Sequence, residues 1–470
     1  MTDKSPPFFP DLPLRSTVPH LKYPALSEKN VLPIIAYLYQ LERAQWMDPA
    51  RHRQLIFTQL DELLRTVFRT VPYYRETLGA VGYDPSQPLD EATWQRVPDL
   101  TRAALQVNGD RLRSYDIPAV MQPFRRTRSS GSTGMPVEVF HPATRMPMMV
   151  AASIMEYTMQ RANFAGKAAS IRFIRGTEHK DGPMHSPDWG SPFAEVLETG
   201  PATMMRADTD PEQQADWIIA EAPNYLQLFP SNLEAVLPIL KDRGAELPSL
   251  HYIRTFGEQL PERIRDTVRD QLGIKIVDTY SAQESGIIAL QCSETDNYHL
   301  VPDLNFTEIL NDDGEPCAPG EIGKMVITDL FNPAFPLIRY EIGDYAEMGE
   351  PCSCGRGWPV IKRILGRVRN LITYPDGSRG WPSVPGKQIG EAVPMRQYQI
   401  VQPTIDELQV NLVMKRPLTD DDRKAVVAIV NDKLGKGFTV SVNEVAEIVR
   451  GANGKYEEFK SLLKPSGSEA

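Results

Sequence analysis

The most informative stretch of the sequence is Arg128-Ser129-Ser130-Gly131-Ser132-Thr133-Gly134-Met135-Pro136, and Val137-Glu138-Val139-Phe140 follows it with the pattern of a β-strand. Glycines let successive backbone N–H groups turn inward on an anion, and Ser and Thr hydroxyls add donors that can also reach a metal ion. The stretch therefore predicts a phosphate-binding loop. Alone it is a modest signal, because a Ser/Gly-rich run is more often a flexible loop or linker.

Length and composition are those of a globular protein. The chain has 470 residues, of which 41% are hydrophobic and 24% charged. Its length suggests roughly two to four domains, and one large α/β domain with a smaller one fits equally well. The net charge of -10 opposes binding to nucleic acid or to an anionic membrane. A local basic pocket for one nucleotide stays compatible with that charge.

The cysteine count and the first residues bear on the compartment. Four cysteines are too few for a disulfide-stapled scaffold of this size, which favours a reducing environment. Met1 to Thr17 is rich in proline and lacks the apolar core of a signal peptide, and no apolar run approaches membrane-spanning length. We expect a soluble cytoplasmic protein.

Helical and strand-like patterns alternate in the first part of the chain, after a helical beginning around Ile56 to Val67 that Pro72 ends. The expected helices are 143–163, 211–222, a segment capped by Ser231 or Asn232, and one after Pro261; the expected strands are Ser170–Ile174, Tyr225–Phe229, Tyr252–Phe256 and Ile274–Thr279. Polar loops, Gly257-Glu258-Gln259 and Tyr280-Ser281-Ala282-Gln283-Glu284, follow the last two strands. Ligands of α/β sheets bind beyond the carboxyl ends of the strands.

The pattern becomes β-rich beyond Gly286, with expected strands Phe306–Leu310, Lys324–Thr328 and Pro336–Tyr340. A helix 420–434 and a strand Val440–Val445 close the chain. The predicted fold class is α/β: a large domain of mixed α/β sheets with a β-rich subdomain, residues 1–367, and a small mobile α+β domain, residues 368–470.

Further segments occur in a characteristic order: Tyr280-Ser281-Ala282-Gln283-Glu284, Ile338-Arg339-Tyr340-Glu341-Ile342-Gly343-Asp344, Ile364-Leu365-Gly366-Arg367 and Asn453-Gly454-Lys455. With the Ser/Gly loop they resemble the core motifs of the adenylate-forming enzymes, the superfamily of acyl-CoA synthetases, peptide-synthetase adenylation domains and luciferase. Within this superfamily the chain most resembles the phenylacetate-CoA ligase-like branch. The segments that carry this resemblance are Val71-Pro72-Tyr73-Tyr74-Arg75, Pro98-Asp99-Leu100-Thr101, Pro336-Leu337-Ile338-Arg339-Tyr340 and Cys352-Ser353-Cys354-Gly355-Arg356.

The resemblance implies that ATP and a carboxylic acid, with an aryl or arylacetic acid as the first guess, give an acyl-adenylate and pyrophosphate. Coenzyme A is the default acceptor of the acyl group. One alternative is transfer to an amine, a hydroxyl or a carrier thiol, or transfer of AMP itself. Another is a non-catalytic binding protein that keeps the fold. A homodimer is compatible with the resemblance.

The resemblance also assigns the phosphate and adenine contacts. The residues that would enclose the β- and γ-phosphates are Ser129, Ser130, Gly131, Ser132, Thr133 and Gly134, with Thr133 or Ser132 near a magnesium ion. Glu284 would bind Mg²⁺, which prefers carboxylate and phosphate oxygens. Tyr280 would stack on adenine beside Ser281, which replaces the family's usual glycine. Gly257 and Glu258 would form the adenine-side loop.

Three residues complete the implied site. Asp344 would accept both ribose hydroxyls, and Arg367 would meet ribose or phosphate oxygens just before the hinge between the domains. Lys455 would bridge the substrate carboxylate and the α-phosphate. Two features depart from the family: Met135 stands where a lysine is common, and Val368-Arg369-Asn370 lacks the two acidic residues usual after Gly-Arg-x. The altered hinge leaves open that the acceptor is not coenzyme A.

Cys292, His299, Cys352 and Cys354 offer three soft sulfurs and an imidazole, which could close a tetrahedral structural zinc site. The C-x-C-G turn is a plausible chelating knuckle, but C-x₆-H is not a standard zinc pair. Free buried cysteines are the alternative.

Overall fold

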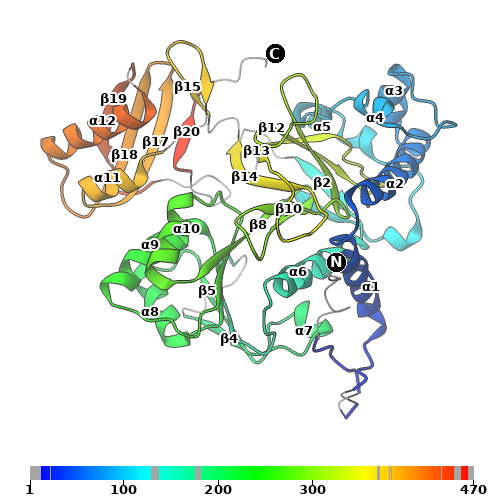
Figure 1. Cartoon of the computed structure of the whole chain (residues 1–470), viewed down its shortest axis with the longest axis horizontal. Coiled ribbons are helices and arrows are strands. Elements are labelled where there is room, and N and C mark those ends of the chain that lie inside the picture. The colour runs from blue at the N-terminus through cyan, green and yellow to red at the C-terminus, as the bar shows by residue number, and fades with distance from the viewer. Residues whose placement is uncertain are drawn as a thin grey trace. The chain divides into compact units, whose positions relative to one another are not determined.

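The structure is a computed structural model that describes residues 12–18, 20–21, 23–128, 137–174, 182–367, 371–380, 382, 384–435, 437–448 and 457–463. The chain divides into two compact units. The large unit comprises Met1–Leu260, Ile264–Ile342 and Ala346–Arg363, and the C-terminal unit comprises Pro261–Arg263, Gly343–Tyr345 and Ile364–Ala470. Figure 1 shows both as mixtures of helices and strands, so the predicted α/β class is confirmed.

A twisted sheet organises the described part of the large unit. Its 12 strands follow the order β11-β12-β13-β14-β10-β9-β8-β7-β6-β3-β5-β4. Its strands are β3 (Ala168–Arg172), β4 (Met184–Ser186), β5 (Ala202–Arg206), β6 (Tyr225–Leu228), β7 (Tyr252–Phe256), β8 (Lys275–Ala282), β9 (Gly286–Gln291), β10 (Tyr298–Leu300), β11 (Asn305–Leu310), β12 (Ile322–Asp329), β13 (Tyr340–Met348) and β14 (Val360–Arg367).

Parallel pairing joins β5, β3, β6, β7 and β8, and antiparallel pairing resumes between β8 and β9. Parallel strands need crossover connections, and helices in this part of the chain provide them. Separate from this sheet, β1 (Arg125–Arg128) and β2 (Glu138–His141) form an antiparallel hairpin.

The helices of the large unit are α1 (Leu32–Ala44), α2 (Pro49–Thr70), α3 (Pro72–Ala80), α4 (Glu91–Gln95), α5 (Arg102–Val107), α6 (Arg145–Met159), α7 (Phe193–Val196), α8 (Pro211–Glu221), α9 (Pro230–Asp242) and α10 (Glu262–Leu272). Sequence-local caps start several of them. Asp210 accepts the Glu212 N–H at 2.8 Å before Pro211 opens α8, and Thr101 accepts the Ala104 N–H at 3.1 Å before α5.

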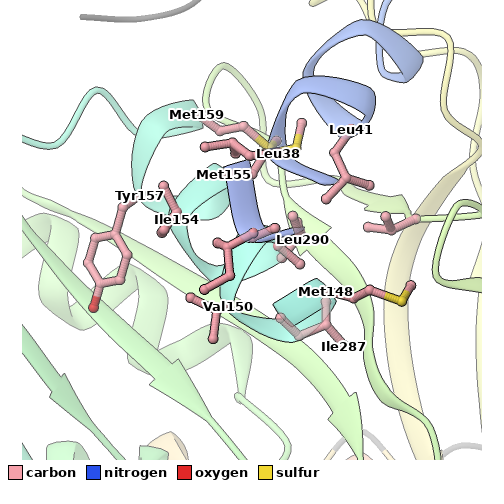
Figure 2. Close-up of a cluster of buried hydrophobic side chains, with 14 of the residues drawn as sticks. Leu38, Leu41, Met148, Val150, Ile154, Met155, Tyr157, Met159, Ile287 and Leu290 are labelled. Atoms are coloured by element: carbon pink, nitrogen blue, oxygen red, sulfur yellow. The ribbon is translucent and has the colours of Figure 1, made fainter. Parts of the chain in front are cut away.

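Two apolar layers cover the parallel strands. Helices α8, α9 and α10 bury residues such as Trp217, Leu233 and Val268 with strand residues on one face. On the other face, α6 lies between α1 and the sheet. Figure 2 shows Met148, Ile154 and Met155 of α6 among Leu38 and Leu41 of α1 and Ile287 and Leu290 of β9, while the Tyr157 hydroxyl points away from this group. Both faces of the parallel strands therefore contribute buried apolar residues to a core.

The C-terminal unit has its own core. Its sheet has the order β19-β18-β17-β20, formed by β17 (Met395–Thr404), β18 (Glu407–Met414), β19 (Thr439–Glu444) and β20 (Phe459–Ser461). A short hairpin, β15 (Ile372–Thr373) with β16 (Arg379–Gly380), and the helices α11 (Gly386–Ala392) and α12 (Asp420–Leu434) complete it. Thr419 and Asp422 form a capping box, which explains why α12 begins at the predicted residue.

Two local expectations are wrong. Pro336–Arg339 is not a strand, because its polar groups bond outside any ladder: the Tyr74 hydroxyl donates to the Pro336 carbonyl and accepts the Ile338 N–H, both at 3.1 Å. Neither Ser231 nor Asn232 caps α9, because the helix already begins at Pro230. Among the described residues no helix has the length and apolar character needed to cross a bilayer.

Arg339 joins the segments that carried the branch resemblance. It is buried, with a φ of 48°, a conformation that costs free energy in a non-glycine residue. Its Nε donates to Asp99 at 2.9 Å and its Nη1 to Glu308 at 2.9 Å, while its carbonyl accepts the Leu100 N–H at 2.8 Å. The motifs Pro98–Thr101 and Pro336–Tyr340 therefore hold each other and fix the start of β13.

We expect Arg339→Met to reduce the free energy of unfolding by about 3–5 kcal/mol, because the change leaves two partly buried carboxylates without their shared cation. Arg269→Met is the matched control, since Arg269 pairs with Asp266 at 3.0 Å on the exposed surface of α10. The control should cost less than about 1 kcal/mol. Urea denaturation of the two variants measures this, and equal losses would contradict the role given to Arg339.

Candidate active site

The predicted phosphate loop connects the two strands of the β1–β2 hairpin. Arg128 pairs with Glu138 at its mouth. Ser129, Ser130, Gly131, Ser132, Thr133 and Gly134 themselves lie outside the described residues, as do Met135 and Lys455. Of this motif, the structure therefore describes only the two paired strands that precede and follow the loop.

The Tyr280–Glu284 motif is a strand followed by a turn. Tyr280 and Ser281 belong to β8, which pairs with β9, so the expectation of a loop beginning at Tyr280 is wrong. The strand is longer than predicted because β9 returns beside it and satisfies its backbone groups. Glu284 lies in the turn with 12% of its side chain exposed, and its Oε1 is 3.7 Å from Nη1 of Arg102.

His141 ties this turn to the strand that leaves the phosphate loop. Its Nε2 donates to the Gln283 carbonyl at 3.2 Å, next to Glu284. Burial, with the positive charge of nearby Arg145, lowers the pKa of His141 to about 4. Sequence reasoning missed this residue, although the alternation Val137, Val139, His141 would have placed it on the buried side of the strand.

The Gly257–Glu258 loop lies beside the Tyr280 motif, because Phe256 of β7 is in register with Thr279 of β8. Gly257 has a φ of 79°, which glycine adopts without strain. The Glu258 carboxylate accepts the Ser231 N–H at 2.9 Å and so satisfies a donor at the start of α9. Glu258 therefore does the capping that was expected of Ser231 or Asn232.

Asp344 and Arg367 occupy strands. Asp344 lies within β13, directly after Gly343, whose φ is 85°, and Arg367 is the last residue of β14. Tyr280, Ser281, Glu284, Gly257 and Glu258 thus share two adjoining strand ends of the large unit. Asp344 is assigned to the C-terminal unit.

The structure brings the predicted zinc ligands together. Cys292 follows β9, His299 lies in β10, and Cys352 and Cys354 lie between β13 and β14. Their ligand atoms all fall within 4.8 Å of one another, with 3.7 Å between the sulfurs of Cys292 and Cys352 and 3.4 Å between Cys354 Sγ and His299 Nε2. Tetrahedral zinc places its sulfur and nitrogen ligands about 3.5–3.8 Å apart. The four residues fit such an ion.

The surroundings of the cluster favour anionic sulfur at one position. Burial raises the pKa of the Cys292 thiol, but hydrogen bonds from His299 and the Glu294 N–H outweigh it and lower the pKa to about 5. Burial raises the pKa of Cys354 to about 11, and the neighbouring Cys292 charge adds to this.

Acid should destabilise the protein through His141. The unfolded imidazole titrates near its ordinary pKa of about 6.5, whereas the native one stays neutral down to about 4. The unfolded state binds more protons in this window, so stability falls as the pH drops from 6.5 towards 4, by at most roughly 3 kcal/mol.

His141→Gln keeps a donor for the Gln283 carbonyl and cannot titrate, so its urea midpoint should fall less between pH 6.5 and 4.5. His185→Gln, at an exposed histidine paired with Glu221, is the control and should behave as the parent protein does. An unchanged pH dependence in His141→Gln would reject this account.

Comparison with known proteins agrees with the motifs. Residues 386–461 match the family model of the CapK C-terminal domain. Phenylacetate-coenzyme A ligase of Thermus thermophilus is 26% identical over 88% of this chain and 97% of its own length, and the Escherichia coli enzyme of that name is 27% identical over 66% and 69%.

Solved structures show the same fold. The crystal structure of 2-hydroxyisobutyryl-CoA ligase in the postadenylation state, in complex with 2-HIB-AMP, superimposes with a TM-score of 0.70 at 16% identity, covering 89% of this chain and 91% of that one. A complex of that ligase with 2-HIB-AMP and CoA in the thioesterification state gives 0.60 over 96% and 97%. In sequence the chain is thus similar over most of its length to phenylacetate-coenzyme A ligases, and in fold it is similar to a CoA ligase of the adenylate-forming kind.

Proposed function

We propose that the protein activates a carboxylic acid with ATP, releases pyrophosphate and transfers the acyl group from AMP to coenzyme A. The single observation that carries this proposal is the hairpin β8–β9, which puts Tyr280 and Glu284 at a strand end and is tied through His141 to the strand leaving the phosphate loop. Ligands of α/β sheets bind at such edges. The relatives named phenylacetate-coenzyme A ligase support the same reaction.

The chemistry requires the site to bring two anions together, because a carboxylate must attack the α-phosphate. Ser129 to Gly134 would hold the β- and γ-phosphates, and the backbone and hydroxyl donors would carry more of this grip than usual because Met135 replaces a lysine. Glu284, with Thr133, would hold a Mg²⁺ ion, which neutralises phosphate charge when bound.

The remaining roles complete the proposal. Tyr280 would stack on adenine beside Ser281, Gly257 and Glu258, Asp344 would accept the ribose hydroxyls, and Arg367 would contact ribose or phosphate oxygens. Lys455, on the small mobile domain of residues 368–470, would reach the adenylation domain of residues 1–367 and stabilise the charge that builds between carboxylate and α-phosphate. We propose the cytoplasm as the compartment.

The acid is proposed to be aryl or arylacetic, as the names of the relatives suggest. An acceptor of the acyl group other than coenzyme A is the alternative, because Val368-Arg369-Asn370 lacks the acidic pair common at the hinge. Transfer to an amine, hydroxyl or carrier thiol would then replace transfer to coenzyme A. Pyrophosphate release over a panel of acids, with and without coenzyme A, tests both ideas. Absence of ATP-dependent turnover over the whole panel would overturn the proposed function.

Lys455→Ala should lower the rate of acid-dependent pyrophosphate release by about 10²–10³-fold, because the variant loses a cation that acts on developing charge. Its affinity for ATP should change little. Lys433→Ala, at an exposed position of α12, is the control and should keep the parent rate. Near-normal pyrophosphate release by Lys455→Ala would reject the assignment.

We also propose that Cys292, His299, Cys352 and Cys354 hold a structural zinc ion that takes no part in the chemistry. Undenatured protein should contain about one zinc per chain, and Cys354→Ser should lose most of it, since a tetrahedral site needs all four ligands. Cys317→Ser is the control, because Cys317 is buried outside the cluster. Protein that contains no zinc and reacts at these cysteines with a thiol reagent would contradict this proposal.

A further inference from the structure

Three arginines share one face of the parallel sheet. Arg172 of β3 is in register with Arg206 of β5, and Arg254 of β7 is in register with Gln227 of β6. Residues in register on parallel strands point to the same face, and alternate residues of one strand share a face. Gln227 is in register with Ser170, two residues before Arg172, so it lies on this face as well. The face is the one that α6 covers, because Arg254 bonds to Glu156 of that helix.

Two of these arginines are neutralised. Arg254 Nε donates to the Glu156 carboxylate at 3.0 Å, and that carboxylate also accepts the hydroxyl of Thr279, the residue before Tyr280. Arg206 is paired with Asp208 at 2.6 Å. The hydrogen bonds of Arg254 and Glu156, between α6 and the sheet, therefore extend to Thr279, which adjoins the Tyr280 motif of the proposed site.

Arg172 differs from its neighbours. Its Nη2 donates to the neutral amide oxygen of Gln227 at 2.5 Å, and no carboxylate of the described residues forms an ion pair with it. Burial, with the charge of Arg254, lowers the pKa of Arg172, although the side chain is still accessible to solvent. An exposed guanidinium that has no carboxylate partner among the described residues can bind an anion that reaches it.

Aromatic rings lie at the same strand ends. The Phe229 ring is 5.1 Å from that of Phe173 and 4.7 Å from that of Phe256, and Phe173 is 45% exposed. Gly257 packs closely against Phe229, since a Cβ there would lie only 3.3 Å from the ring. This edge thus combines an apolar wall with a guanidinium.

We infer that the acid that this protein activates carries a second anionic group, which Arg172 binds while the apolar body of the acid lies against Phe173, Phe229 and Phe256. The substrate class is a dicarboxylic acid or a close equivalent. Arg172 is a specificity-determining residue, because a planar guanidinium can bind a carboxylate with two parallel hydrogen bonds. This inference rests on the proposed function and narrows it.

The experiment is acid-dependent ATP–pyrophosphate exchange with matched pairs of acids: benzoate with terephthalate, phenylacetate with 1,4-phenylenediacetate, and hexanoate with adipate. The dicarboxylate of at least one pair should have a kcat/KM about 10-fold or more above that of its monocarboxylate. Arg172→Met should lower that kcat/KM by about 10- to 100-fold, mainly through KM, which corresponds to one lost charged interaction. The monocarboxylate should change by less than about 2-fold, since only interactions with the second anion are lost.

Arg206→Met is the matched control, because Arg206 lies on the same face but is already neutralised by Asp208. It should leave both acids of each pair unchanged, and thermal melting checks that both variants fold. Preference for monocarboxylates, or an equal effect of Arg172→Met on both acids, would overturn the inference while leaving the proposed function standing. If none of these acids supports exchange, both the inference and the proposed function are overturned.

Discussion

A buried guanidinium and its two carboxylates join three segments of the large unit that are distant in sequence. An isolated charge is costly inside a protein, so Arg339 is stable in its place only because Asp99 and Glu308 come to it from other segments of the chain. Lys324 extends the group, since its Nζ donates to Asp99 at 2.7 Å and to Glu341 at 2.6 Å. Several ion pairs and hydrogen bonds together hold the start of β13, which explains how Arg339 is kept at a positive φ.

The motifs that distinguish the branch thus have two kinds of role. Tyr74 and Asp99 contact the Pro336–Tyr340 segment and serve the fold. Thr101 caps α5, and the next residue, Arg102, reaches Glu284. A residue that serves the fold, Thr101, is therefore the direct neighbour of Arg102, which lies 3.7 Å from the proposed magnesium ligand Glu284.

Local patterns were enough for much of the fold. The first residue of α12 follows from a capping box at Thr419, and the alternation of apolar strands and amphipathic helices from 143 to 286 follows from periodicity. The corrections concern partners distant in sequence. Pro336–Arg339 has the sequence pattern of a strand, but the Tyr74 hydroxyl forms hydrogen bonds with its backbone in place of a neighbouring strand. Strand β8 continues through Tyr280 because β9 pairs with it. His141 went unnoticed, since its role depends on the carbonyl of Gln283.

The proximity of one group of side chains was predictable from residue type alone. Three cysteines and a histidine, separated by as many as 62 positions, were predicted to be ligands of one ion, and the structure places their ligand atoms within 4.8 Å of one another. The group formed by Arg172, Gln227, Arg254 and Glu156 could not be predicted from the sequence. Its members belong to β3, β6, β7 and α6 and form no sequence motif. Its charge imbalance is visible only after the sheet has put them in register.

The central claim is that the carboxylate of the substrate attacks the α-phosphate of ATP. Turnover of an acid labelled with ¹⁸O in its carboxylate tests this directly, with mass spectrometry of the nucleotide product. The account predicts AMP that carries one labelled oxygen, because the carboxylate oxygen that bridges to phosphorus leaves with AMP. Labelled inorganic phosphate together with ADP, or unlabelled AMP, would contradict it.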